Sequence, residues 1–155
     1  MEKKKSYEVK FEDIVLRRAR GDDNMEEIAR LIYQTDPYIY PYWFSDDIEE
    51  AKRVLIPLIK KDNFVFNYKH MYVAIDKSIN KIVGLVCIID NKMPLDFDYT
   101  SLRNYNFNYK YTIDNYIMAL INEVKELGVP YLSNVAVHHD YRGKRIGTLL
   151  LRYVI

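Results

Sequence analysis

Cysteine is nearly absent from the sequence, with Cys87 the only one among 155 residues. A single cysteine excludes an internal disulfide framework and a zinc site with several cysteine ligands, and it favours a reducing cytoplasm. No run approaches the ~18 apolar residues of a membrane-spanning helix, and the charged residues 1–13 carry no apolar stretch of a secretory signal. We therefore expect a cytoplasmic protein with no membrane partner.

An excess of positive charge is missing as well. The 23 Lys and Arg residues nearly balance the 22 Asp and Glu residues, which gives a net charge of +1. A general nucleic-acid binder needs a broad basic face, so this balance argues against a nucleic-acid partner. Apolar residues make up 49% of the chain, and 155 residues are enough to bury a real core.

The pattern of apolar residues predicts one domain over residues 1–155, of the α/β class with an α+β arrangement around one mixed sheet. Residues 1–8 are expected to be a flexible tail. The two middle strands are separated by a short turn and form a predicted antiparallel hairpin. Strands are predicted over 14–20, 70–76, 81–90 and 131–137, and helices over 25–35, 46–61, 113–127 and from 148 onward.

Several residues carry specific local expectations. Ser45 and Thr112 are expected to cap the helices that follow them, and Pro57 to kink its helix or end the regular part. Gly84, inside a strand, indicates a bulge or a close backbone approach. The aromatic residues 38–44 are expected to form a loop, which either lines a substrate cleft or packs into the core.

The most informative stretch is residues 132–151, where a predicted strand runs through a loop into a helix. The first N–H groups of a helix have no internal partner, and the helix dipole is positive there, so an anion such as a pyrophosphate can bind. Glycines would let the backbone approach the anion, and basic side chains would add charge. The residues concerned are Arg142, Gly143, Lys144, Arg145 and Gly147. The common Walker and dinucleotide-binding patterns are both absent.

This stretch resembles the acyl-CoA loop of the GNAT superfamily of N-acetyltransferases, whose pattern is [Q/R]-x-x-G-x-[G/A]. Here the loop reads Arg142 to Gly147, with Arg145 where the family usually has glycine. If the backbone there is unusual, a residue other than glycine costs about 1 kcal/mol. The run before it, "VAVHHDYRG", resembles the family's V-x-P-x-Y-R-G, with His139 in place of proline. The order of elements is also similar, except that the helix 113–127 is inserted.

The resemblance implies acetyl-CoA as cosubstrate and direct attack of a primary amine, from a small molecule or a peptide, on the acetyl thioester. The backbone of Val135, Ala136 and Val137 would contact the pantetheine arm. The backbone from Gly143 to Thr148 would hold the pyrophosphate. The implied cofactor-binding residues are Val135, Ala136, Val137, Arg142, Gly143, Lys144, Arg145, Ile146, Gly147 and Thr148. A non-catalytic CoA-binding or interaction module is the alternative.

A complete domain of this family continues beyond the helix that starts at residue 148 and carries its usual acid tyrosine there. We therefore expect a domain that is incomplete on its C-terminal side, with no catalytic residue assignable. The strand 131–137 would then be an open edge, and self-association is expected, because open edges recruit other strands.

A metal site at residues 138–140, which read His-His-Asp, is a competing interpretation. Adjacent strand residues point to opposite faces, so His138 and His139 are not expected to converge. A zinc site requires three or four convergent ligands, so we predict that no metal binds here. Cys87 lies in an apolar run and is expected to be an inert packing residue.

Overall fold

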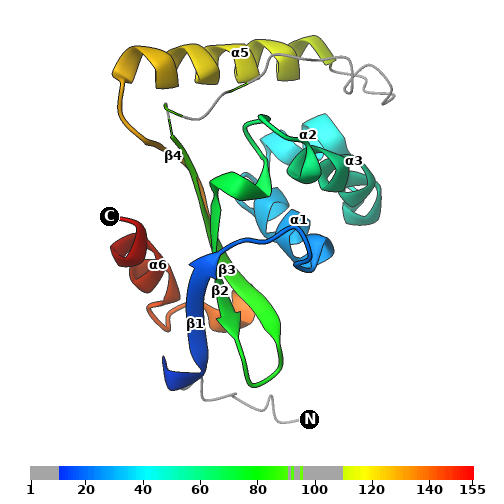
Figure 1. Cartoon of the computed structure of the whole chain (residues 1–155). Helices are drawn as coiled ribbons and strands as arrows, with labels where there is room; N and C mark the ends of the chain where they lie inside the picture. The colour runs from blue at the N-terminus through cyan, green and yellow to red at the C-terminus, as the bar shows by residue number, and fades with distance from the viewer. Residues whose placement is uncertain (1–10, 91, 93–94, 96–109) are drawn as a thin grey trace.

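The computed structural model describes residues 11–90, 92, 95 and 110–155, so the predicted tail at residues 1–8 lies outside the described residues. Its sheet has four strands in the order β1-β2-β3-β4, and every neighbouring pair is antiparallel (Figure 1). The expected α+β class and the hairpin are thereby confirmed. The elements are β1 (Ile14–Arg18), α1 (Met25–Gln34), α2 (Ile39–Phe44), α3 (Ile48–Lys60), β2 (Met71–Asp76), β3 (Lys81–Ile89), α5 (Lys110–Leu127), β4 (Tyr131–Val137) and α6 (Ile146–Val154), with short 3-10 turns η1 (Phe11–Asp13), η2 (Tyr68–His70) and η3 (His139–Tyr141).

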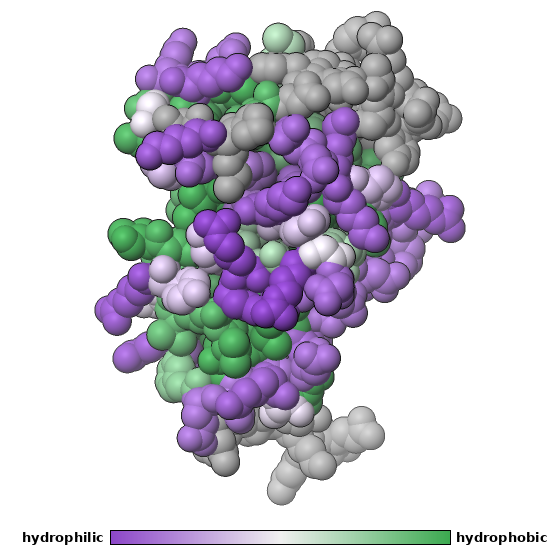
Figure 2. Space-filling model, viewed as in Figure 1, coloured by the Kyte–Doolittle hydropathy of each residue, from purple (hydrophilic) through white to green (hydrophobic). Residues whose placement is uncertain are grey.

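Helices cover both faces of the sheet. The larger core lies on the side of α1, α2 and α3, where fully buried Ile28, Ile32 and Leu55 pack with residues of β2 and β3. The smaller core lies on the opposite side, where Ile146 and Leu150 of α6 pack against the sheet. In Figure 2, an apolar area occupies the lower half of the surface, where β1 and α6 lie in Figure 1.

Gly84 combines both features that the sequence predicts for it. The β2–β3 pairing shifts register between Ala74 and Ile75, so β3 carries a bulge next to this glycine. A Cβ built on Gly84 would lie 3.0 Å from Leu150 Cδ1 and 3.3 Å from the Ala136 carbonyl oxygen. The missing side chain therefore lets α6 lie directly on the middle of the sheet.

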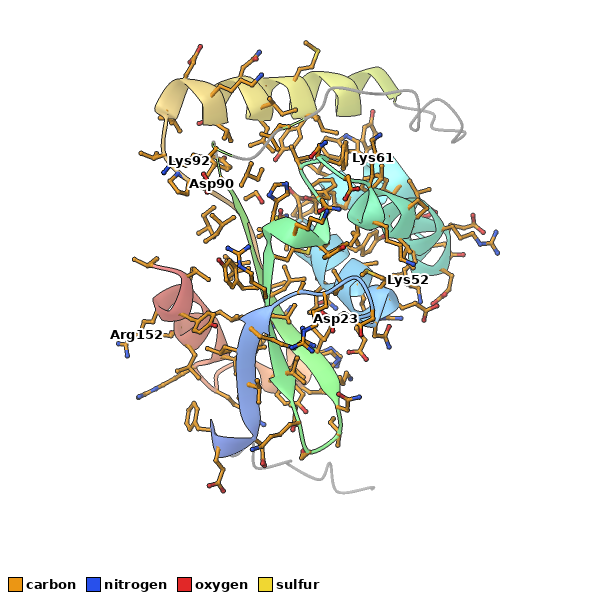
Figure 3. The ribbon with its side chains drawn as sticks, viewed as in Figure 1. Asp23, Lys52, Lys61, Asp90, Lys92 and Arg152 are labelled. Atoms are coloured by element: carbon orange, nitrogen blue, oxygen red, sulfur yellow. The ribbon has the colours of Figure 1, made fainter. Side chains whose placement is uncertain are left out.

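Polar contacts fix α1 against the sheet. Asn24 caps α1, because its Oδ1 accepts the N–H groups of Glu26 and Glu27. The Glu27 Oε2 atom then accepts the backbone N–H of Ile82 at 2.6 Å, beside the bulge in β3. The Arg17–Asp23 ion pair, at 2.6 Å, closes the turn between β1 and α1 (Figure 3).

The aromatic segment and the cap of the next helix differ from the prediction. Residues 38–44 do not form a loop, because Ile39–Phe44 form the short helix α2. The cap of α3 is Asp47, whose carboxylate accepts the Glu49 N–H. Ser45 instead ends α2 at φ 136°, and its hydroxyl accepts the Asp47 N–H.

Other boundaries shift for local reasons. α3 continues through Pro57 to Lys60 and does not end at the proline. α5 begins at Lys110, so Thr112 lies inside the helix and is not its cap. β1 ends at Arg18, two residues earlier than predicted. Within the part of the chain that is described, no helix has the length and apolar character needed to cross a membrane.

Candidate functional site

The strand β4 has a partner on one side only. It pairs with β3 and lies at the edge of the described sheet, as predicted. The register passes from Cys87↔Asn134 to Ile88↔Leu132, so Ser133 is an extra residue that forms a bulge. Bulges of this kind leave one residue unpaired and often lie beside active sites. Val135 is 36% exposed, which leaves the edge beyond the bulge accessible.

Asn134 fixes this bulge from behind. It is buried, its Nδ2 donates to Thr35 Oγ1 and to the Tyr40 hydroxyl, both at 3.0 Å, and its Oδ1 accepts from Ser133 Oγ at 2.9 Å. Burial raises the pKa of Tyr40 to about 12, so its phenol stays neutral. The side chain of one β4 residue thus connects the open edge to α1 and α2. In the sequence, the polar pair Ser-Asn inside the strand "YLSNVAV" is the feature that could have indicated this connection.

The loop after β4 is held by a buried hydrogen bond. The turn η3 places the Tyr141 hydroxyl 2.6 Å from Asp76 Oδ2, at the end of β2. Burial alone would raise the pKa of Asp76, but hydrogen bonds from Ser78 and Tyr141 outweigh it and hold that pKa below its usual value. Tyr141 therefore fixes the loop after β4 to the end of β2.

The N-terminus of α6 presents unpaired backbone donors. At the start of the helix, the Leu149 N–H donates to the Arg145 carbonyl at 3.0 Å. The preceding N–H groups of Ile146, Gly147 and Thr148 have no helical acceptor. The residue at the cap position, Arg145, supplies no side-chain hydrogen bond. α6 begins two residues before the predicted start at Thr148.

Arg145 adopts the backbone conformation that favours glycine. Its φ of 63° and ψ of 16° lie in the left-handed region, as does the φ of 74° at Gly143. This explains why the family pattern has glycine at the fourth loop position. The Arg145 side chain is exposed. The loss of folding free energy at this position therefore comes from the strained backbone and not from side-chain packing.

The structure brings all ten predicted cofactor-binding residues into one continuous strand–loop–helix unit. Arg142 Nε donates back to the Val137 carbonyl at 3.2 Å. The Lys144 ammonium lies 5.7 Å from the centre of the Tyr141 ring. A Cβ at Gly147 would meet Val137 Cγ2 at 3.6 Å, an ordinary contact, so the end of β4 and the start of α6 are close neighbours. Basic side chains and unpaired N–H groups suit a diphosphate.

The expectation that His138 and His139 diverge is wrong. β4 ends at Val137, so His138 is no longer a strand residue, and the two imidazole rings stack with centroids 4.3 Å apart. With Asp140 they offer ligand atoms within 4.8 Å of one another. However, His138 Nδ1 accepts the Asp140 N–H at 3.2 Å, and its Nε2 lies 3.3 Å from the Lys81 ammonium. Burial and the Lys81 charge lower the pKa of His138. The absence of a metal stays a prediction.

A cavity of about 160 Å³ opens beside the β4 bulge. Tyr40 and Trp43 are buried core residues, which confirms core packing of the aromatic segment, and they also line this cavity. That the segment lines a substrate cleft stays a prediction. The Tyr116 ring of α5 meets Trp43 at 4.9 Å in a T-shaped contact. The described residues that line it are Thr35, Asp36, Ile39, Tyr40, Trp43, Tyr116, Ser133, Asn134 and Val135.

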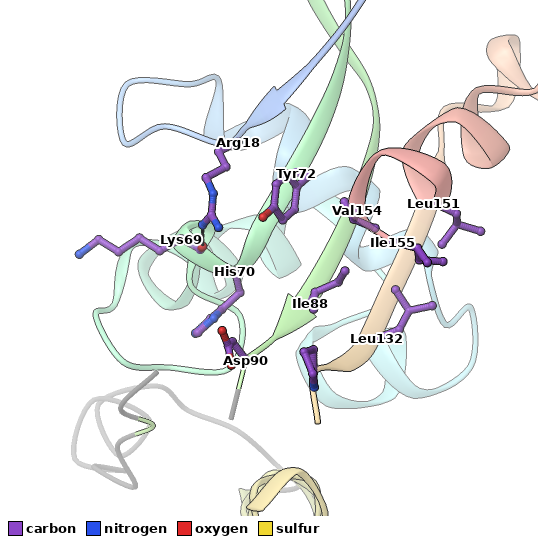
Figure 4. Close-up of a pocket in the computed structure, with 11 residues that line it drawn as sticks. Arg18, Lys69, His70, Tyr72, Ile88, Asp90, Leu132, Leu151, Val154 and Ile155 are labelled. Carbon is purple, nitrogen blue, oxygen red and sulfur yellow. Dashed lines mark hydrogen bonds between the residues drawn. The ribbon is translucent and has the colours of Figure 1, made fainter. Parts of the chain in front are cut away.

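A second cavity of about 310 Å³ lies on the other face, near the C-terminal end of α6 (Figure 4). Its polar side holds His70 and Asp90, and its apolar side holds Leu151 and Val154. Burial lowers the pKa of His70, and His70 Nδ1 has no hydrogen-bond partner among the described residues. Cys87 lies in the larger core, on the α1 side of the sheet, where burial raises its thiol pKa to about 12 and makes it unreactive.

An antiparallel sheet whose edge strand runs into a basic loop and the open N-terminus of a helix has the architecture of an acyltransferase domain. The sequence model of the acetyltransferase (GNAT) family matches residues 25–155, and the chain belongs to this family. Among curated proteins, none matches the chain significantly.

Solved structures of N-acetyltransferases share the fold. An N-acetyltransferase from Staphylococcus aureus Mu50 superposes with a TM-score of 0.53 at 18% identity, over 90% of this chain and 74% of that one. A mosquito arylalkylamine N-acetyltransferase like 5b gives 0.53 at 20% identity, over 90% and 68%. An agmatine N-acetyltransferase mutant in its apo form gives 0.52 at 17%, over 92% and 68%. At these identities the likeness establishes the fold.

Proposed function

We propose that the chain is an acetyl-CoA-dependent N-acetyltransferase that acetylates a primary amine by direct attack. The observation that carries the proposal is the N-terminus of α6. There the N–H groups of Ile146, Gly147 and Thr148 have no helical acceptor, and they follow directly on a basic loop and the open edge of β4. The pyrophosphate binds these donors, with Arg142, Lys144 and Arg145 adding positive charge. The pantetheine arm follows the backbone of Val135, Ala136 and Val137.

The acetyl group then reaches the β4 bulge. A bulge leaves backbone groups outside the ladder, and an unpaired N–H near Ser133 is suited to polarise the thioester carbonyl. The amine nitrogen attacks the carbonyl carbon, the C–S bond breaks, CoA leaves as the thiol and the amine loses one proton. The proton acceptor is not assigned among the described residues.

The cavity beside the bulge is the acceptor site. Its volume of about 160 Å³ is small against the ~300–1,000 Å³ of typical ligand pockets, which favours a small amine over a peptide. The names of two structural neighbours, an agmatine and an arylalkylamine N-acetyltransferase, also support a small amine. A cytoplasmic location accompanies the proposal, supported by the free, buried thiol of Cys87.

Calorimetry with CoA and acetyl-CoA, followed by detection of free thiol in the presence of a panel of amines, tests the proposal. Saturable binding and amine-dependent thiol release are expected. Binding without release from any amine would support the alternative of a non-catalytic CoA-binding module. No binding at millimolar CoA would refute both.

The open edge of β4 also supports self-association, because unpaired N–H and C=O groups recruit strands. CoA would cover part of this edge and reduce the association. Light scattering at several protein concentrations, with and without CoA, tests this. A mass that does not change with concentration would refute it.

A further inference from the structure

The acceptor cavity carries one kind of charge. Among the described residues that line it, Asp36 is the only charged one, and the others are aromatic, apolar or neutral polar. Its Oδ1 accepts the N–H groups of Tyr38 at 2.9 Å and Ile39 at 2.8 Å. The carboxylate thus caps α2 and also faces the cavity. A cavity with a carboxylate and no cation favours a positively charged ligand.

Aromatic rings strengthen this preference. Trp43 is 5% exposed and meets the Tyr116 ring in a T-shaped contact, and both line the cavity. Electron-rich ring faces attract cations by about 0.5–2 kcal/mol, depending on how far the site excludes water. The negative charge of Asp36 is close enough to raise the pKa of Tyr116, together with burial, the largest cause. The carboxylate and the aromatic pair therefore act on the same small space.

The reacting nitrogen needs the opposite environment. An amine attacks a thioester only after it has lost its proton, and an adjacent carboxylate stabilises the protonated form. Asp36 is therefore unsuited to hold the nitrogen that reacts at the β4 bulge. It is suited to hold a second positive group at the other end of the substrate.

We infer that the acceptor is a short linear diamine, with the distal ammonium bound by Asp36 beside the Trp43–Tyr116 pair, and the second nitrogen at the β4 edge. This inference rests on the proposed function and specifies its substrate. Tyr116 comes from α5, the helix that the sequence resemblance predicts to be an insertion into the family pattern. This chain therefore completes its acceptor wall with an element of its own.

A matched pair of amines tests the inference. 1,4-Diaminobutane and 1-aminobutane have the same chain, and only the first has a distal ammonium. We expect kcat/KM for acetyl transfer to the diamine to exceed that for the monoamine at least tenfold at low salt. Asp36→Asn keeps an oxygen for the α2 cap and removes the charge, so it should reduce this ratio at least tenfold, mainly through KM. Glu126→Gln, on the exposed face of α5 and outside the cavity, is the control and should keep the ratio.

A binding measurement separates failure of the inference from failure of the proposed function. Trp43 is the only tryptophan of the chain, so its fluorescence reports occupation of the cavity without any turnover. Saturable quenching by 1,4-diaminobutane, weakened by Asp36→Asn, is expected even without acetyl-CoA. If diamine binds in this way and no amine is acetylated, the proposed function fails and the ligand class stands. Equal responses to diamine and monoamine, or a diamine response that Asp36→Asn leaves unchanged, would overturn the inference.

Discussion

The two regions along β4 differ in whether backbone groups or side chains form them. At its C-terminal end, the strand runs into a loop whose chemistry comes mainly from backbone N–H groups between Gly143 and Thr148. At the bulge around Ser133, the adjacent cavity is built from residues of the α1–α2 connection, α2, β4 and α5. One region is positive and the other carries a single carboxylate. In the proposed function, a diphosphate and an amine cation would therefore bind at differently charged regions along the same strand.

A backbone site and a side-chain site should respond differently to mutation. The following changes are directed at the α6 end, and each has the same control, the amine-induced change of Trp43 fluorescence. Loss of CoA binding with an unchanged Trp43 response would show that the two regions act separately. Equal loss of CoA binding and of the Trp43 response would contradict this separation.

The largest effect is expected for Gly84→Val. Its new side chain would meet Leu150 and Ile146 at 3.0–3.2 Å, where the glycine now lets α6 approach the sheet. Overpacking of this kind costs about 1–3 kcal/mol, and displacement of α6 should weaken CoA binding as well. Urea unfolding and calorimetry measure the two losses. Unchanged stability would show that α6 adjusts without strain.

Gly147→Leu should weaken CoA binding more than tenfold, about 1.4 kcal/mol, with little change in unfolding free energy. The first side-chain carbon fits, at 3.6 Å from Val137 Cγ2, but a larger group would occupy the space where the backbone meets phosphate. Lys144→Ala, which removes one charge, should cost less. Calorimetric titration compares the two variants, and a larger loss in Lys144→Ala would mean that charge, and not the backbone, dominates.

Tyr141→Phe should lower stability by about 1 kcal/mol at neutral pH, because it removes a hydrogen bond to a charged carboxylate. The pKa of Asp76 is depressed in the folded state, so the stabilisation is present above the unfolded pKa of aspartate. It is lost as pH falls through the folded pKa. Unfolding curves of both proteins should therefore converge in acid. A difference that stays constant with pH would show that Asp76 ionisation is not involved.

The smallest change is a gain. Arg145→Gly places glycine at φ 63° and should stabilise the fold by about 0.5–1 kcal/mol, with CoA affinity preserved or improved. Thermal unfolding and calorimetry measure both. If CoA binding instead falls more than tenfold, the Arg145 guanidinium is a phosphate ligand.

The same distinction explains what could be predicted from the sequence. The loop was predictable, because a backbone site needs contiguous residues such as Arg142-Gly143 and leaves a short pattern. The strained position was predictable at Arg145 for the same reason, since one family glycine is replaced there. The class of the fold followed from apolar periodicity in long segments such as residues 25–35 and 131–137.

The acceptor cavity was not predictable, because Asp36, Tyr116 and Ser133 are far apart in sequence and only tertiary packing brings them together. The helix α2 escaped prediction because Pro41 and consecutive aromatic residues suggest a loop, while packing of Tyr40 and Trp43 into the core overrides local preference. Stacking of His138 on His139 was missed because the alternation of a strand was applied to two residues that follow β4, which ends at Val137 as predicted.

The side chain of Asn134 connects the strand that carries both regions to the wall of the cavity. Its amide connects β4 to Thr35 and Tyr40, at 3.0 Å each, and these two residues line the acceptor cavity. A ligand that shifts β4 would therefore change the free energy of ligand binding in the cavity. A ligand in the cavity would likewise change the free energy of ligand binding at β4. Linkage requires the two effects to be equal, so acetyl-CoA must change amine affinity by the same factor by which the amine changes acetyl-CoA affinity. Truncating Asn134 would move that common factor toward one.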